Sequence, residues 1–218
     1  NGRPAAEGAG GDGPLFTANI LNGMPVARFN GTTEYMKLSD FDPTLSGLTV
    51  FAVAKYGAIP PAVYEPIFSQ FDTNSQRAWS IGGTTLTGRL RGKVSKDGDA
   101  TNLKYYKSGS AAAASGDFFI GAMVFGSSAL SLYVNGVKEN TSKDTDGTVD
   151  VIHNSTADLT IGAELASGSV VANSYIEGDI AEIIVYDQKL DDGERSRVER
   201  YLSNKYGINV FTCYISAR

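Results

Sequence analysis

The chain has 218 residues, 42% of them hydrophobic, and its 25 glycines are scattered between short apolar runs, which suits one globular sheet domain with a sizeable core. Nineteen basic and 24 acidic residues give a net charge of -5, and no stretch concentrates Lys and Arg, so we expect no nucleic-acid partner. No apolar run approaches the roughly 18–20 residues that cross a bilayer, so we also expect no membrane insertion.

The two ends of the chain differ from its middle. Residues 1–14 are rich in Gly and Ala and predict a flexible lead. Residues 15–209 are expected to form the domain, and residues 210–218 a C-terminal tail without a clear pattern. The single cysteine, Cys213, lies in this tail and cannot form an internal disulfide, so the fold must be stable from packing alone.

The first predicted elements form a hairpin. Pro25–Asn30 alternates between apolar and polar residues, Asn30-Gly31 is a favoured turn pair, and Glu34–Leu38 is the expected return strand. Leu48–Lys55 then follows, apolar on both faces, which predicts a central strand. The segment Tyr56–Pro66 contains three prolines and should leave the sheet as a loop, a candidate rim for a binding site.

Further short strands follow at regular spacing, separated by Gly, Asp, Asn and Ser, as is typical of a sandwich or barrel. Asn135-Gly136 between two of them predicts a tight hairpin with a type I′ turn. The expected strands are Pro66–Phe71, Arg77–Gly82, Thr87–Val94, Asn102–Lys107, Phe118–Phe125, Leu130–Val134, Val137–Glu139, Leu159–Ala163 and Tyr175–Asp187.

One helix is expected, over residues 192–206, directly after the last strand. Asp191 is the predicted N-cap with Glu194 three residues later, and Gly207 stands where a left-handed cap would end the helix. An apolar stripe should pack on the sheet, while the charged residues face water. The stripe comprises Val198, Tyr201, Leu202 and Tyr206, and the water-facing set comprises Arg195, Arg197, Glu199 and Arg200. The fold class is therefore all-β, a two-sheet antiparallel sandwich with one C-terminal amphipathic helix.

Four blocks together resemble the laminin-G-like, concanavalin A-like lectin and glucanase family of jelly-roll domains. The blocks are Gly23–Gly31, Ser131–Val137, Leu159–Ala163 and Gly178–Asp187 with its helix. The version with a terminal helix ending Tyr201–Gly207 is similar to modules of large bacterial surface or secreted proteins and of phage structural proteins. The resemblance implies two face-to-face sheets and a module for adhesion or glycan binding, although some related sandwiches are glycoside hydrolases.

A catalytic alternative comes from Glu177-x-Asp179-x-x-Glu182. Retaining glucanases of the laminarinase type use this spacing for a nucleophile and an acid roughly 5–5.5 Å apart. Plain strand alternation would put Glu177 and Asp179 on one face and Glu182 on the other. We therefore favour a structural role for these carboxylates and keep a glycoside hydrolase using Glu177 and Glu182 as the alternative.

No cofactor is required by these patterns, but calcium is a possible ligand. Hard oxygen ligands on loops suit Ca²⁺, and Asp97 with Asp99, and Asp144 with Asp146, offer closely spaced carboxylates. Neither pair belongs to a full twelve-residue calcium loop. Solvated turns are the competing interpretation.

Sugar binding needs flat aromatic faces together with planar polar groups. Tyr56 and Tyr64 fall in the proline-rich loop, while Trp79, Tyr105 and Tyr106 lie on strands that could line one sheet face. These five residues are the candidate ligand-binding set, although the only tryptophan of a sandwich is more often a core residue.

The favoured function is a non-catalytic module that binds a glycan or another cell-surface ligand within a larger extracellular or phage structural protein. An alternative of a different class is a structural decoration or appendage domain that contacts neighbouring chains of a surface assembly or virion. Either function would place the module outside the cell, at a cell surface or at a virion surface.

Overall fold

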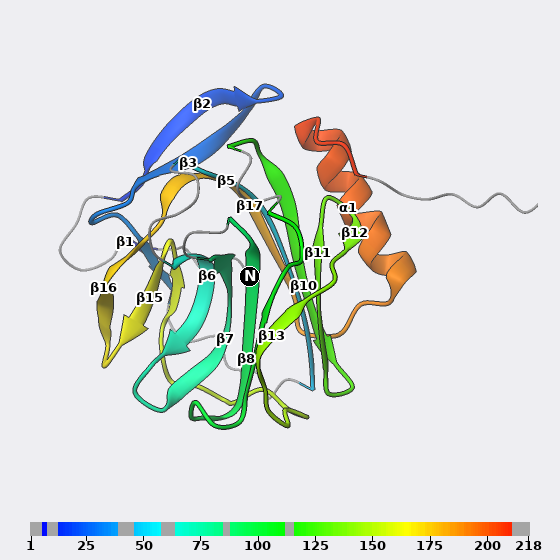
Figure 1. The fold of residues 1–218 in the computed structure, drawn as a ribbon. Coiled ribbons are helices and arrows are strands. Elements are labelled where there is room, and N and C mark those ends of the chain that lie inside the picture. The colour runs from blue at the N-terminus through cyan, green and yellow to red at the C-terminus, as the bar shows by residue number, and fades with distance from the viewer. Residues whose placement is uncertain are drawn as a thin grey trace, which may run out of the picture.

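The computed structural model describes residues 6–7, 13–38, 46–57, 64–84, 88–111 and 116–210. Two sheets face each other, and the single helix α1 lies against the outer side of one of them, so that the molecule has three layers (Figure 1). The described strand pairs are antiparallel apart from one short contact between β15 and β6. The predicted fold class, an antiparallel sandwich with a C-terminal helix, is confirmed.

The seven-stranded sheet has the order β12-β11-β10-β5-β17-β3-β2. Its middle strand β5 pairs with β10 and β17, and nearly all of its residues are buried. Both faces of β5 are apolar because one meets the opposite sheet and the other meets α1. The strands are β2 (Leu15–Leu21), β3 (Met24–Asn30), β5 (Gly47–Tyr56), β10 (Phe119–Gly126), β11 (Ala129–Val134), β12 (Val137–Lys138) and β17 (Glu177–Tyr186).

The ten-stranded sheet has the main order β1-β4-β14-β6-β7-β8-β9-β13, and the hairpin of β15 and β16 joins it through β6. The inner face of this sheet carries much of the core, and its outer face carries the candidate site described below. The strands are β1 (Ala6–Glu7), β4 (Met36–Leu38), β6 (Glu65–Asp72), β7 (Gln76–Gly83), β8 (Leu90–Gly98), β9 (Leu103–Lys107), β13 (Ser142–Asp146), β14 (Leu159–Ile161), β15 (Ala163–Ala166) and β16 (Ser169–Tyr175).

The apolar core has two parts, one on each side of the seven-stranded sheet. Val50 and Ala52 of β5 belong to the cluster between the two sheets, whereas Phe51 and Val53 belong to the cluster under α1. This division follows from the two-residue period of a strand, which sends alternate side chains to opposite faces.

The ends of α1 (Asp192–Tyr206) are as predicted. The Asp191 carboxylate accepts a hydrogen bond from the Glu194 backbone N–H, the Glu194 side chain accepts one from the Asp191 N–H, and Gly207 closes the helix with φ of 68°. Among the described residues, no helix is long and apolar enough to cross a membrane.

The buried side of α1 differs from the predicted stripe. Leu202 and Tyr206 are buried as expected, but Tyr201 is 48% exposed, and Arg195 and Glu199 are buried. These two charged residues form an ion pair one helical turn apart, and the Arg195 guanidinium lies 3.9 Å from the centre of the Tyr133 ring. Because pairing and stacking offset part of the cost of burying these charges, the side of the helix that faces the sheet is partly ionic.

Of the two predicted Asn-Gly hairpin turns, one is confirmed and the other is wrong. Asn135-Gly136 joins β11 and β12 with positive φ at both residues, as predicted. Asn30-Gly31 does not close a hairpin, because β3 and β4 belong to different sheets. The Asn30 side chain instead accepts backbone N–H groups of the following loop, which carries the chain across the sandwich. The hairpin of β3 pairs it with β2 through Asn22-Gly23.

Several sequence predictions touch residues that the structure describes only in part. Within the expected lead, Ala6–Glu7 forms the short strand β1 against β4. The rest of the lead before residue 13, residues 58–63 of the proline-rich loop, and the tail from residue 211 with Cys213 lie outside the described residues.

Candidate functional site

The outer face of the ten-stranded sheet carries a cluster of charged and aromatic side chains. Arg91 and Lys93 alternate along β8 with Leu90 and Val94, which belong to the core between the sheets. The two cationic side chains therefore point away from the sandwich. Tyr105 of β9 stands directly beside Lys93 in the sheet register.

Arg91 lies between two aromatic rings. Its guanidinium carbon is 3.6 Å from the centre of the Tyr64 ring and 4.2 Å from the centre of the Tyr105 ring. All three side chains are half-buried. This arrangement holds the guanidinium plane by cation–π attraction on both sides. The buried Arg91 Nε has no hydrogen-bond partner among the described residues.

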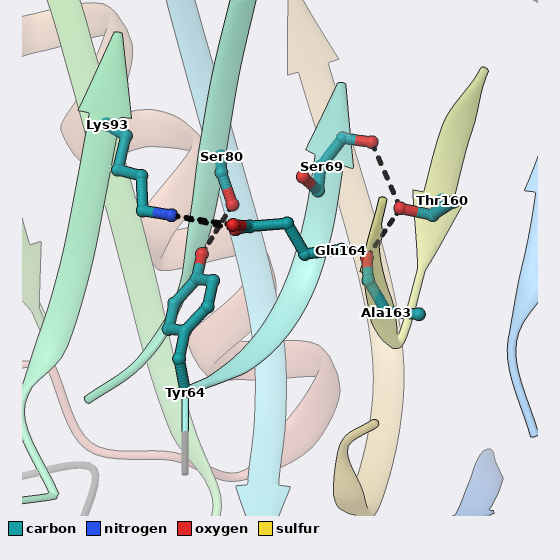
Figure 2. Close-up of polar contacts among 7 residues, drawn as sticks. All are labelled: Tyr64, Ser69, Ser80, Lys93, Thr160, Ala163 and Glu164. Atoms are coloured by element: carbon teal, nitrogen blue, oxygen red, sulfur yellow. Dashed lines mark hydrogen bonds and ion pairs between the residues drawn. The ribbon is translucent and has the colours of Figure 1, made fainter. Parts of the chain in front are cut away.

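Lys93 and Glu164 form a buried ion pair next to these rings (Figure 2). The Lys93 Nζ donates to both carboxylate oxygens of Glu164, at 2.8 and 3.0 Å, and also lies 4.3 Å from the centre of the Tyr64 ring. Burial lowers the pKa of Lys93 to about 8, although the Glu164 carboxylate acts in the opposite direction. The ion pair ties β15, which carries Glu164, to β8.

Hydroxyl groups complete the cluster. The Tyr64 hydroxyl is hydrogen-bonded to that of Ser80 on β7, and Thr160 donates to the carbonyl oxygens of Ala163 and Ser69 (Figure 2). Burial raises the pKa of Tyr64 and raises that of Tyr105 to about 12, so both phenols stay neutral at physiological pH. The cluster therefore places neutral hydroxyls beside fixed charges.

The structure brings two of the five candidate ligand-binding residues together, Tyr64 and Tyr105. Tyr56 and Trp79 are only 1% and 0% exposed, and they belong to the core between the sheets. Tyr56 stacks on Phe119, so the side chain that was expected on a loop fills the core instead. As parts of a ligand surface, Tyr56 and Trp79 were wrongly predicted.

Tyr106 lies away from the cluster, on the inner side of β9. It is 4% exposed, and its hydroxyl donates to the Asp146 carboxylate of β13. Neighbouring residues on a strand face opposite ways, so Tyr105 and Tyr106 cannot serve the same surface.

The carboxylates expected to bind calcium have protein partners. Asp144 pairs with Lys107 at 2.6 Å, whereas Asp146 pairs with Lys104 and Lys143 at 2.8 Å each. A bulge in β13 between Lys143 and Thr145 separates the two carboxylates by shifting the alternation of side chains.

The other candidate calcium pair stabilises the turn between β8 and β9. Asp97 accepts hydrogen bonds from the Asn102 side chain and from the Asp99 N–H, and these bonds lower the pKa of Asp97. Asp99 accepts a hydrogen bond from Ser75. Among the described residues, no group of three His, Cys, Asp or Glu side chains is placed to hold a metal ion. Calcium binding stays a prediction without a described set of ligands.

The two glutamates of the glucanase alternative do not face each other. Glu182 points toward α1, where it pairs with Lys205 at 3.1 Å, because a bulge in β17 follows Ile180. Glu177 is exposed at the start of the strand, about 16 Å of strand length away. Retaining glycosidases need carboxyl groups only about 5–5.5 Å apart. The structure contradicts this pair as a catalytic dyad.

Arg91, Lys93 and Glu164 were missed as site residues by sequence reasoning. The pattern Arg91-Gly92-Lys93 between the apolar residues Leu90 and Val94 does carry a signal, because both charges must share one face. Glu164 gives no such signal, since its partner lies 71 residues away in the chain.

Comparison with known proteins agrees with the fold. Residues 30–194 match the concanavalin A-like lectin/glucanases superfamily. The chain belongs to this superfamily. Among curated proteins, no sequence matches the chain.

Several solved structures share the fold. A heptameric SAP-like pentraxin from Limulus polyphemus is 18% identical with a TM-score of 0.58, covering 79% of this chain and 80% of the pentraxin. The binding domain of Paraclostridial Mosquitocidal Protein 1 is 11% identical with a TM-score of 0.67, and the match covers 93% of this chain and 48% of that chain.

A structure of botulinum neurotoxin type C, whose cell entry depends upon interaction with two ganglioside molecules, is 12% identical. Its TM-score is 0.62, and the match covers 92% of this chain and 47% of that chain. The chain thus spans about half the length of the toxin chains that it matches.

Proposed function

We propose that this domain is a non-catalytic module that binds a glycan on the outer face of the ten-stranded sheet. The observation that carries the proposal is the stack of Tyr64, Arg91 and Tyr105, with the Lys93–Glu164 ion pair beside it. Membership of the concanavalin A-like superfamily supports the proposal, as does the likeness to the binding domain of Paraclostridial Mosquitocidal Protein 1.

The chemistry of the stack suits a sugar. The half-buried ring of Tyr105 offers an apolar face to the C–H groups of a pyranose, while the guanidinium of Arg91 offers several N–H donors in a fixed plane. Because tyrosine rings hold the guanidinium on both sides, little conformational entropy would be lost when a ligand binds.

The biological setting forms part of the proposal. A module of this kind would act in adhesion or recognition at a cell surface, as part of a larger extracellular or phage structural protein. Its resemblance to modules of bacterial surface proteins and phage particles supports that setting. The two matched chains are about twice as long as this chain, which supports a place within a larger protein.

A glycan array followed by calorimetry with the best binder tests this function. We expect Tyr105→Ala to weaken binding about tenfold through lost stacking, and Arg91→Lys to weaken it because the planar fork is lost. Tyr201→Ala removes an exposed tyrosine from α1 and should leave the affinity unchanged. An array without binders, or full affinity in Tyr105→Ala, would contradict the proposal.

A second candidate function is contact with neighbouring chains of an assembly. It is favoured by β2, the last strand of the seven-stranded sheet, where Leu15, Phe16 and Ile20 are 64%, 71% and 38% exposed. Exposed apolar side chains on an edge strand favour pairing with another chain. Light scattering measures whether the wild type forms oligomers, and Phe16→Lys should shift any such oligomer toward the monomer. A wild type that stays monomeric at high concentration would count against this candidate.

A further inference from the structure

The two sheets end on the same side of the molecule, and a groove of about 440 Å³ lies between their last strands. β13 ends the ten-stranded sheet there and β12 ends the seven-stranded sheet. The groove is lined mainly by polar side chains, among them Lys104, Tyr106, Ser131, Lys138, Thr141 and Lys143. Its volume lies within the range of small-molecule sites in proteins.

A single carboxylate organises the positive charges of this groove. Asp146 accepts hydrogen bonds from the ammonium groups of Lys104 and Lys143, at 2.8 Å each, and from the Tyr106 hydroxyl. These three donors lower the pKa of Asp146, so it stays charged. One negative charge thus faces two positive ones and holds them at the groove wall.

The remaining charges leave the groove with positive excess. Lys138 is exposed and forms no ion pair with a described residue, and the Glu139 carboxylate accepts a hydrogen bond from the Ser110 N–H. The lining therefore holds three lysines against two carboxylates, in a chain whose net charge is -5. A local excess of cations in an acidic protein attracts anionic ligands to that place.

We propose that this groove binds an acidic saccharide through its carboxylate or sulfate group. Lys143 and Lys138 would contact the oxyanion, since Lys143 keeps 51% of its side chain exposed. The hydroxyls of Ser131 and Thr141 stand on the same walls and match the hydroxyls of a sugar ring. The structure keeps this site apart from the outer-face cluster, because Tyr105 and Tyr106 point to opposite sides of β9.

Calorimetry at low salt tests the groove with a sulfated heparin-derived tetrasaccharide, the carboxylated trisaccharide trigalacturonate and, as a simple anion, sodium sulfate. We expect at least one saccharide to bind more tightly than sulfate, with an affinity that falls as salt rises. Lys143→Gln should weaken it about three- to tenfold. The matched control is Lys96→Gln, which removes a surface lysine paired with Asp150 elsewhere.

Asp146→Asn should change the affinity for the acidic saccharide in the opposite direction. Removing the carboxylate frees both ammonium groups, so this variant should bind the acidic saccharide several-fold more tightly. A purely structural ion-pair cluster would give no such gain. Melting temperatures measured in parallel establish that each variant is folded. Lys138→Gln provides a second lysine substitution that leaves the Asp146 contacts intact.

Three outcomes would overturn the inference. The first is unchanged affinity in both Lys143→Gln and Lys138→Gln, the second is weaker binding in Asp146→Asn, and the third is sulfate binding at least as tightly as both saccharides. Failure of the proposed outer-face site can be distinguished from failure of the groove, because Tyr105→Ala should leave binding in the groove intact. Loss of acidic-saccharide binding in Tyr105→Ala, with full binding in Lys143→Gln, would assign that ligand to the outer face.

Discussion

At the scale of residues, this domain buries charged groups that its sequence pattern assigns to the surface. Lys93 with Glu164, and Arg195 with Glu199, form ion pairs away from solvent. Removing one partner from such a pair typically costs about 3–5 kcal/mol, because the other charge is left buried and unpaired. These pairs also orient their elements: Lys93–Glu164 joins β8 to β15, whereas Arg195 and Glu199 pair within α1, and Arg195 contacts β11 through the Tyr133 ring.

Glu65 is another buried ionisable residue, and it predicts a pH dependence of stability. It is 4% exposed, and burial raises its pKa from 4.5 to about 7, with the Glu177 carboxylate adding to the rise. The folded state thus binds more protons than the unfolded state between these two values. The free energy of unfolding should fall as pH rises from about 4.5 to about 7 through this residue.

Urea unfolding of the wild type and Glu65→Gln across pH 4–8 measures this effect. The variant should show a smaller fall in this window, because the amide does not titrate, while the raised pKa of the buried Glu199 leaves a residual fall. Glu177→Gln should keep the fall but move its midpoint to lower pH, since one source of the raised pKa is gone. The same slope in Glu65→Gln as in the wild type would assign the dependence to other groups.

At the scale of elements, turns and bulges decide which side chains meet. The bulge in β17 after Ile180 turns Glu182 toward α1, and the bulge in β13 parts Asp144 from Asp146. Each bulge inserts one residue and so reverses the facing of every residue beyond it. A motif read with strict alternation across such a point therefore gives the wrong neighbours.

The two Asn-Gly turns of β3 allow a matched comparison. Gly23 and Gly31 have φ of 77° and 74°, but a Cβ on Gly23 would meet nothing within 4 Å, whereas one on Gly31 would lie 2.8 Å from the Glu177 Cβ. Gly23→Ala should cost about 1–2 kcal/mol for the left-handed backbone alone. Gly31→Ala should cost a further 1–3 kcal/mol, roughly, from overpacking.

Chemical denaturation of both variants checks the difference. The shared backbone conformation makes Gly23→Ala the control for strain, so the excess loss in Gly31→Ala reports the contact with β17. Equal losses would mean that the sheet-crossing loop relaxes to admit the methyl group.

At the scale of the whole molecule, three layers bury two separate apolar surfaces. Leu202 lies 1% exposed between α1 and the seven-stranded sheet, in the cluster that includes Phe51 and Val53. Leu202→Ala should lower the free energy of unfolding by about 2–5 kcal/mol because it leaves a cavity. Asn204→Ala, on the exposed side of the same helix, should stay within about 0.5 kcal/mol of the wild type.

Thermal and urea unfolding of these two variants measures the contribution of the helix layer. A loss for Leu202→Ala as small as for Asn204→Ala would mean that α1 packs only loosely and that the sandwich is stable without it.

The sequence by itself determined the class of fold and the ends of the helix. Strand periodicity, the Asn135-Gly136 turn, the Asp191 capping box and the Gly207 cap depend on residues close together in the chain. The two-sided apolar pattern of Leu48–Lys55 likewise identified β5 as central, because burial on both faces excludes an edge position.

Only the tertiary structure decided which side chains form the candidate sites. Glu164 reaches Lys93 across 71 residues of chain, and Asp146 reaches Lys104 across 42. Tyr64 and Tyr105 share Arg91, although their own positions give no hint of it. Such contacts depend on the order of strands and on bulges, and these are set by how two sheets and a helix pack, a long-range property that local periodicity does not encode.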